Sequence, residues 1–175
     1  MHPHTKGCVR ACGREKGDTM ALLVGQHLNG IDKKGRVSVP KPFRAALEVE
    51  GFAGIYAYPL FKFPAVEACG EAFMTRLSAS LDQLDMFSDD QDDLAAVILE
   101  NAHALAFDTE GRITLPEPLI AAGGFTSKAL FVGRGGRFQI WAPNAYKVHR
   151  ADAFERARAR GITLKLQPDE EGRDG

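Results

Sequence analysis

The chain contains few cysteines and no long apolar run, and these two shortages exclude several classes of protein. Its three cysteines, Cys8, Cys12 and Cys69, match no zinc or redox spacing, and an odd number leaves no complete disulfide framework. No apolar run approaches the ~18 residues that span a bilayer, and the N-terminus lacks the apolar middle of a signal peptide. We therefore expect a protein of the cytoplasm, a reducing compartment, without membrane contact.

A dominant charge of one sign is also missing from the chain as a whole. The formal net charge is −1 and 26% of the residues are charged, so composition alone does not indicate nucleic-acid binding. Locally the balance differs, because residues 32–44 carry a net charge of +4 and residues 82–93 carry −6. The sequence thus predicts a basic end and an acidic patch.

The combinations of residues that mark an enzyme are absent from the sequence. It shows no nucleophile paired with a base, no convergent carboxylates and no phosphate cradle. The glycine-rich residues 133–136 lack the strand and helix context of a nucleotide-binding motif, so they predict a hairpin turn. The five histidines are scattered, which favours surface or packed positions over metal ligands. We expect no enzymatic activity, no cofactor, no bound metal and no small-molecule substrate.

What the sequence does contain is a segment that occurs twice. Residues 31–40 read IDKKGRVSVP and residues 107–116 read FDTEGRITLP, at a constant offset of 76. The Asp, Gly, Arg and Pro of the motif are identical in the two copies. Val37 and Val39 are replaced by the apolar residues Ile113 and Leu115, and the serine between them by threonine. This similarity predicts a duplicated structural unit.

Each copy has the pattern of a tight turn followed by a strand. The aspartate can accept hydrogen bonds from N–H groups further along the turn, and the glycine can take the positive φ that closes a hairpin. After the glycine, polar and apolar residues alternate over four positions, which predicts a strand with one buried face. Pro40 and Pro116 end that strand because proline has no N–H to donate.

The remaining pattern predicts a similar order of elements in both halves. In the first half we expect strands at 22–31, 55–58 and 61–63, a short helix at 42–47, an amphipathic helix at 66–84 and another helix starting at Ser88. In the second half we expect strands at 103–107, 112–115, 129–132 and 137–141, with helices at 117–122 and 143–160. Residues 1–19 and 167–175 are predicted to be disordered, which makes Met20 the expected natural start.

The repeated Asp-x-x-Gly-Arg motif is the best candidate for function, and two interpretations of it stay open. In the structural interpretation, Asp32 and Asp108 hold the turns, and Arg36 and Arg112 bond these aspartates across them. In the functional interpretation, the planar fork of arginine contacts the phosphates and guanine edges of DNA.

The residues inside the two turns differ in charge. Lys33 and Lys34 lie beside the arginine of the first copy, where extended cations can reach a DNA backbone. Thr109 and Glu110 take their places in the second copy, which makes that turn much less cationic. For the acidic patch at 82–93, the simpler interpretation is that aspartates stabilise a helix start, and the alternative is a partner-binding role.

These motifs resemble the MraZ family of bacterial transcriptional regulators, which is built from two SpoVT-AbrB domains. The resemblance rests on GQHLN at 25–29, the motif at 32–40, its second copy at 108–112, LFVG at 130–133 and FQIW at 138–141. It covers residues 20–165, nearly the whole chain that we expect to be ordered.

The resemblance implies an α+β fold of two tandem swapped-hairpin (AbrB-like) small β-barrels with flanking helices. The first SpoVT-AbrB domain would occupy 26–68, a helical connection 69–101, the second domain 102–145 and a C-terminal helix 146–166. It also implies a sequence-specific DNA-binding regulator that represses its own operon in the cell-division and cell-wall gene cluster. Ring-like homo-oligomers would bind promoter repeats in double-stranded DNA, at the nucleoid.

The family's Asp-x-x-x-Arg motif falls on Asp32 with Arg36 and on Asp108 with Arg112. The first pair is expected to bind DNA, and the second to be structural or a weak DNA contact. Local charge extends the expected DNA-binding residues to Lys33, Lys34, Lys41 and Arg44. The alternative function is an antitoxin-like or other protein-interaction module without specific DNA reading, whose acidic patch and C-terminal helix bind a partner protein.

Overall fold

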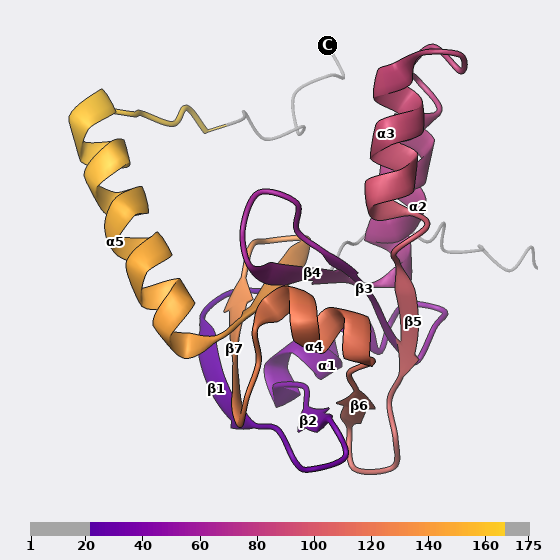
Figure 1. Ribbon diagram of the computed structural model, residues 1–175, viewed down its shortest axis with the longest axis vertical. Helices are drawn as coiled ribbons and strands as arrows, with labels where there is room; N and C mark the ends of the chain where they lie inside the picture. Colours follow the sequence, from indigo (N-terminus) through magenta and orange to yellow (C-terminus); the bar gives the residue numbers. More distant parts are fainter. Residues whose placement is uncertain (1–21, 167–175) are drawn as a thin grey trace, which may run out of the picture.

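The computed structural model describes residues 22–166, which form eight strands and five helices (Figure 1). The first copy contributes β1 (Gln26–Gly30), β2 (Arg36–Ser38), α1 (Lys41–Leu47), β3 (Gly54–Pro59), β4 (Ala65–Cys69), α2 (Glu71–Leu81) and α3 (Asp89–Ile98). The second copy contributes β5 (His103–Ala106), β6 (Arg112–Thr114), α4 (Glu117–Gly123), β7 (Lys128–Gly133), β8 (Arg137–Trp141) and α5 (Pro143–Arg160). The two copies thus share one order of elements, with α5 standing where the first copy has α2 and α3.

Six strands form one antiparallel sheet in which the two copies are interleaved. Its order is β1-β7-β8-β4-β3-β5. In the repeat, β1 is equivalent to β5, β7 to β3 and β8 to β4, so equivalent strands are met in the same order when the sheet is followed from either edge. Consequently β1 pairs with β7 of the other copy, and β5 pairs with β3. The central pair is β4 with β8, where Glu67 lies opposite Gln139. The copies are therefore related by an approximate two-fold symmetry in which they exchange their outer strands.

The second sheet consists of β2 and β6, the strands that follow the two repeated turns. They pair antiparallel, with Val37 opposite Ile113, and both side chains are buried. Val39 and Leu115 are buried as well, whereas the hydroxyl side chains between the apolar ones are exposed. The predicted strand with one buried face is thus confirmed in both copies.

The hydrophobic core draws its largest side chains from both copies. Phe43 of α1 and Leu119 of α4 are almost fully buried, and the Phe43 ring lies 5.1 Å from that of Phe138 in β8. Burial of each such side chain stabilises the fold by roughly 1.5–3 kcal/mol. Both short helices carry proline in their first turn, where its missing N–H leaves no helical hydrogen bond unmade. The contacts across the copies mean that this core belongs to the two copies jointly.

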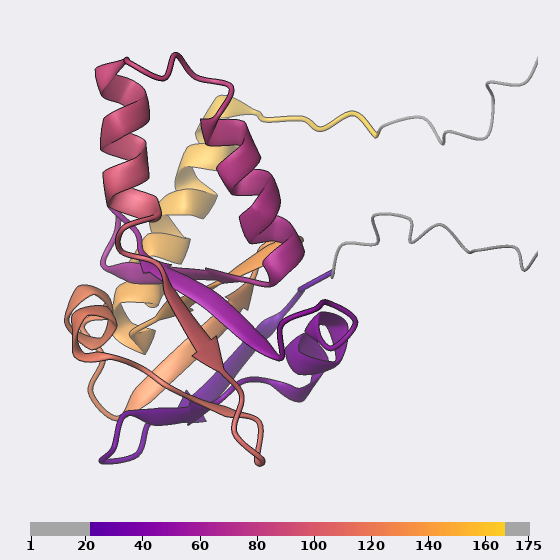
Figure 2. The same cartoon turned by 90° about the vertical axis from the view of Figure 1, so that its right-hand side faces the viewer.

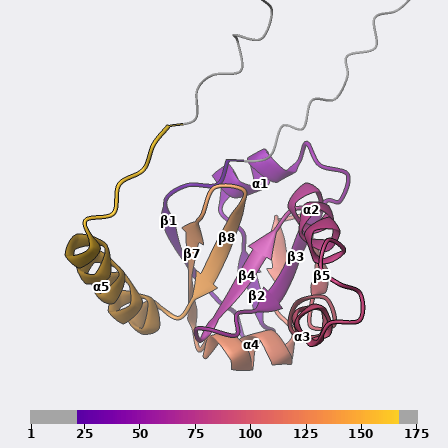
Figure 3. The ribbon, with the colours of Figure 1, turned by 90° about the horizontal axis from the view of Figure 1, so that it is seen from above.

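Two helical extensions leave the sheet on opposite sides. The helices α2 and α3 contact β3, while α5 contacts β7 at the other side (Figures 1 and 3). None of the residues of α3 is buried, and in α5 only Tyr146 is. Figure 2 shows the α2–α3 hairpin projecting away from the sheet, with the two repeated turns at the opposite end of the molecule. Both extensions therefore expose most of their surface.

The α+β class is confirmed, whereas the two tandem barrels are not. Over residues 22–166 the strands form one six-stranded sheet, with β1 and β5 as its open edges, and one two-stranded sheet. The exchange of strands leaves no mark in the sequence, because backbone hydrogen bonds are the same with any partner strand. The domain boundaries at 68, 101 and 145 stay predictions.

The prediction for residues 61–69 was wrong. No strand forms at 61–63, and residues 65–69 form β4 instead of the first turn of a helix. All five residues of β4 are buried, and a buried run of this length fits the strand and helix periods alike. Gly70 then separates the strand from α2 and serves as the N-cap of that helix, which ends at Leu81.

The described residues also bear on membrane contact and metal binding. None of the helices in 22–166 is long and apolar enough to cross a bilayer. Over the same range, no group of three His, Cys, Asp or Glu side chains is placed to hold a metal ion. The expectations for residues 1–19 and 167–175 lie outside the described residues.

Candidate functional site

The first repeated turn is held by the carboxylate of Asp32. Its Oδ1 accepts hydrogen bonds from the backbone N–H groups of Lys34 and Arg36, both at 2.9 Å, and its Oδ2 accepts one from Nε of Arg36 at 2.7 Å. Gly35 closes the turn with φ +74°, a conformation that other residues rarely adopt. The bond from the Arg36 N–H is the main cause that lowers the pKa of Asp32, so this carboxylate keeps its charge.

The second turn repeats this geometry. Asp108 accepts from the N–H groups of Glu110 and Arg112 at 2.9 Å, and from Nε of Arg112 at 2.8 Å. The backbone bond from Arg112 lowers the pKa of Asp108, and the side-chain bond to Asp108 raises the pKa of Arg112. The Asp–Arg bond expected across each turn is thus present in both copies.

The two turns are fastened to each other by backbone hydrogen bonds. The carbonyl of Gly35 accepts from the N–H of Leu115 at 2.9 Å, and the carbonyl of Gly111 accepts from that of Val39 at 3.1 Å. Each turn therefore supports the strand that follows the other turn. As a result, both turns emerge at the same end of the molecule (Figures 1 and 2).

The first turn offers unpaired positive charge. Lys33 and Lys34 are exposed and form no ion pair within residues 22–166. Arg36 contacts Asp32 through Nε and through Nη2, both at 2.7 Å. Its guanidinium carries more N–H donors than these contacts use. Three cations thus share this exposed turn with a single carboxylate.

The second turn has its arginine neutralised instead. Arg112 contacts Asp108 through Nε at 2.8 Å and Glu110 through Nη1. Its side chain is 27% exposed, against 34% for Arg36. One guanidinium here faces two carboxylates, so the turn carries a net negative charge. The charge difference expected from the sequence is therefore reinforced by the ion pairs.

Arg44 lies against the second turn rather than the first. Its Nε donates to the carbonyl of Val39 at 3.1 Å, and its guanidinium covers Gly111 so closely that a Cβ there would overlap it. Ile120 holds the equivalent place over Gly35 of the first turn. Lys41 is exposed at the start of α1. The exchange of strands thus brings a cation of the first copy to the acidic turn of the second, which sequence distance does not indicate.

Asn29 supports the first turn although its role was not predicted. Its Nδ2 donates to the carbonyl of Ser38 at 2.7 Å, which ties β1 to the end of β2. Leu105 stands at the equivalent position of the second copy, so this side-chain bond has no counterpart there. The two copies differ at this position, since the first has a polar residue where the second has an apolar one. That difference is the sequence signal that could have indicated this role.

Cys69 and two histidines are part of the packing. Cys69 is a buried free thiol, and burial raises its pKa to about 12, which keeps the thiol protonated. His27 packs edge-on against Phe43, and His149 stacks on Trp141 with ring centroids 4.6 Å apart. These contacts explain why the three residues stand where they do.

Comparisons with known proteins agree on one family. Residues 98–164 match the family model described as "MraZ protein, putative antitoxin-like". The chain is 41% identical over 156 residues to "Transcriptional regulator MraZ" of Gluconacetobacter diazotrophicus, covering 87% of this chain and 98% of that relative. Relatives of the same name from Parvibaculum lavamentivorans and Rickettsia canadensis are 44% and 37% identical, covering 75% and 83% of this chain and 83% and 98% of their own. These names indicate regulation of transcription rather than an enzymatic activity.

Proposed function

We propose that this chain, which belongs to the MraZ family of transcriptional regulators, binds double-stranded DNA through its first repeated turn. The observation that carries the proposal is the positive charge of Lys33 and Lys34, which are exposed, and of Arg36, which is partly exposed, on one turn held by Asp32. Contacts of lysine and arginine with phosphates supply much of the affinity of proteins for DNA. Lys41, exposed on α1, and Arg44, beside the second turn, extend the basic surface toward neighbouring phosphates.

Arg36 is the residue that we expect to read base edges. Two contacts with Asp32 fix its guanidinium, so less side-chain freedom is lost when it binds. Its planar fork matches the O6 and N7 acceptors of guanine in the major groove. Asp32 then acts as a positioning residue. The second turn, with Arg112 held between Asp108 and Glu110, is proposed to be structural or at most a weak DNA contact.

The first prediction compares Arg36→Ala with Arg112→Ala, which remove the same side chain from the two turns. Arg36→Ala should weaken binding to the region upstream of the gene by about 1–3 kcal/mol, or about 5- to 150-fold in Kd. Arg112→Ala should leave affinity within about threefold, because its guanidinium is occupied by carboxylates. Fluorescence anisotropy with a labelled duplex measures both.

Thermal unfolding and light scattering show whether each variant keeps its fold and its assembly. Equal losses of affinity at intact assembly would refute the division of labour between the turns. Parent-like affinity of Arg36→Ala would favour the antitoxin-like or protein-interaction alternative.

A second prediction concerns the lysines of the first turn. Lys33→Ala should weaken binding to all duplexes alike and should reduce the slope of log affinity against log salt by about 1, because one phosphate contact is lost. Titrations at several salt concentrations give this slope. Thr109→Ala, at the equivalent position of the second turn, is the control and should leave it unchanged. Binding by the parent that does not respond to salt would contradict the phosphate contacts.

We further propose that several copies act together on spaced repeats in the promoter of the chain's own operon, in the cell-division and cell-wall gene cluster, and repress it. One turn binds weakly, but an assembly presents several turns at a high effective concentration. Footprinting upstream of the gene should reveal regularly spaced protection, and a promoter fusion should gain expression when Arg36 is replaced. A single protected site, or lower expression, would oppose this part of the proposal.

A further inference from the structure

The loop between α2 and α3 exposes two large apolar side chains amid negative charge. Phe87 is 91% exposed and Met86 is 75% exposed. Six aspartates lie within residues 82–93, and none of them forms an ion pair in the described chain. We call residues 82–93 the acidic tip. Large apolar side chains exposed side by side and rimmed by polar ones mark interaction sites.

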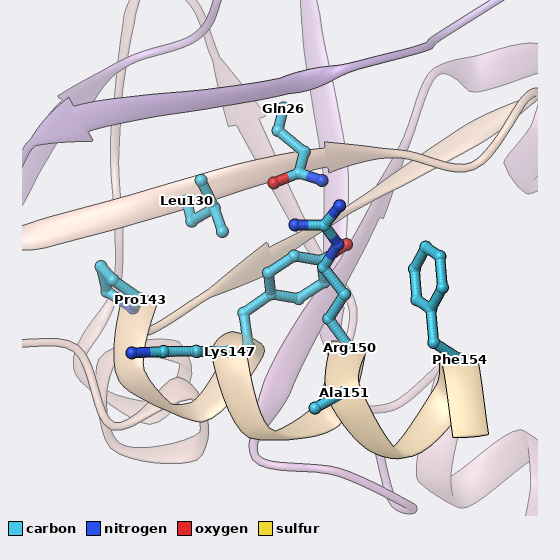
Figure 4. A pocket seen from close by; sticks show the side chains of 8 residues that line it. Gln26, Leu130, Pro143, Lys147, Arg150, Ala151 and Phe154 are labelled. Atoms are coloured by element: carbon cyan, nitrogen blue, oxygen red, sulfur yellow. The ribbon is translucent and has the colours of Figure 1, made fainter. Parts of the chain in front are cut away.

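A groove with the complementary chemistry lies beside α5. It has a volume of about 490 Å³ between α5 and the strands β1 and β7, and Leu130, Tyr146 and Phe154 give it an apolar lining (Figure 4). Lys147 and Arg150 of α5 also line it, and neither forms an ion pair within residues 22–166. We call it the α5 groove.

Arg150 dominates the charge of the α5 groove. Figure 4 shows its side chain crossing the groove toward Gln26 of β1, and its guanidinium lies 5.3 Å from the ring centroid of Phe154. That ring is 59% exposed, so the cation and the apolar surface are both accessible. An aromatic or thioether side chain accompanied by carboxylates is the chemistry that suits such a groove.

The acidic tip has the size and charge to fill this groove. A cavity of about 150 Å³ accepts a benzene ring, so the groove has room for the Phe87 ring with Met86 beside it. The hairpin and α5 stand on opposite sides of the sheet, which keeps a tip away from the groove of its own chain (Figures 1 and 3). We propose that Phe87 and Met86 of one copy insert into the α5 groove of a second copy, while aspartates of the tip pair with Lys147 and Arg150.

This contact joins two different surfaces, so it is head-to-tail. Every pair formed in this way still carries one free tip and one free groove, and further copies can add until the chain of contacts closes. The inference rests on the self-association proposed above and supplies its surfaces. Within one copy, the α2–α3 hairpin and the two repeated turns lie at opposite ends of the molecule (Figure 2), so the acidic tip that makes the contact is separate from the turns proposed to bind DNA.

Two complementary variants of the full chain test the contact by light scattering without DNA. The tip variant carries Met86→Ala and Phe87→Ala, and the groove variant carries Arg150→Glu and Phe154→Ala. The parent should have the mass of several copies, and each variant alone the mass of one. An equimolar mixture should form a complex of two chains, because the tip variant keeps its groove and the groove variant keeps its tip.

Arg36→Ala is the control that separates this contact from DNA binding, since it should keep the mass of the parent. Phe87→Leu, which preserves an apolar anchor, should also assemble. The contact is overturned if either double variant keeps the parent's mass. It is also overturned if the mixture shows only the mass of one chain while both variants retain the parent's unfolding temperature. The contact is also overturned if the unmodified chain has the mass of one copy, even if it then binds a different protein.

Discussion

At the scale of single residues, two aspartates hold the turns from which the proposed interface is built. Asp32 and Asp108 accept backbone hydrogen bonds that lower their pKa values below the usual range. A carboxyl whose pKa is lowered by folding stabilises the folded chain at every pH above its pKa in the unfolded chain, about 3.9. This stabilisation disappears as the pH falls through the lower pKa of the folded chain.

The third prediction follows from this sign. Asp108→Ala should lower the unfolding temperature at pH 7, and the difference from the parent should shrink steadily below about pH 4. Thermal unfolding followed by circular dichroism between pH 7 and pH 2 measures it. Asp152→Ala, on the exposed surface of α5, should change little at any pH. A difference that is as large at pH 2 as at pH 7 would show that the ionised carboxylate is not the cause.

At the scale of elements, α3 depends on its cap because packing does little for it. Oγ of Ser88 accepts from the N–H of Gln91 at 3.2 Å, and three aspartates in the first turn lie at the positive end of the helix dipole. No residue of α3 is buried. Three of the six aspartates of the acidic patch, Asp89, Asp90 and Asp92, thus lie where the sequence suggested that they stabilise a helix start.

The fourth prediction tests this dependence. Ser88→Ala should destabilise α3 by about 1 kcal/mol, which hydrogen exchange would report as roughly fivefold faster exchange of its amides. The global unfolding temperature should change less, because the core is untouched. Ser80→Ala in α2, where the hydroxyl bonds only the carbonyl of Arg76, is the matched control. Equal effects of the two substitutions would argue against the cap.

Most elements were predictable from the sequence, but their partners were not. Alternation around Val37, the cap at Ser88 and the glycine that ends α4 each act locally, so the chain shows them directly. The spacing of four residues likewise predicted the bond of Arg36 to Asp32. The position of Arg44 over Gly111 depends on strands exchanged between distant segments, and no local pattern records that exchange.

At the scale of the whole molecule, the two copies are needed together. Within a copy, β3 pairs with β4 and β7 pairs with β8, whereas every other strand pair joins the first copy to the second. The core is shared in the same way, since Phe43 of the first copy packs on Phe138 of the second. A single copy has the turns and helices of the fold but lacks the partners of its outer strands.

The fifth prediction is that residues 20–101 do not fold alone into a one-copy sheet. Without β7 and β6, the strands β1 and β2 have no partners. Mixing 20–101 with 102–166 should restore the circular dichroism and dispersed amide spectrum of the parent. Dispersed amide resonances from 20–101 at the mass of one copy would contradict the interleaving.

The exchange of outer strands also means that β1 is synthesised well before the strand with which it pairs. Gln26 pairs with Val132, so β1 leaves the ribosome long before its partner has been made. At roughly 5–20 residues per second, the delay amounts to roughly 5–20 s. During that time β1 presents a free backbone edge, which is a template for pairing with another chain. Nascent chains on neighbouring ribosomes of one message carry the same unpaired β1. A strand of a neighbouring chain can therefore pair with β1 before the chain's own β7 has been made.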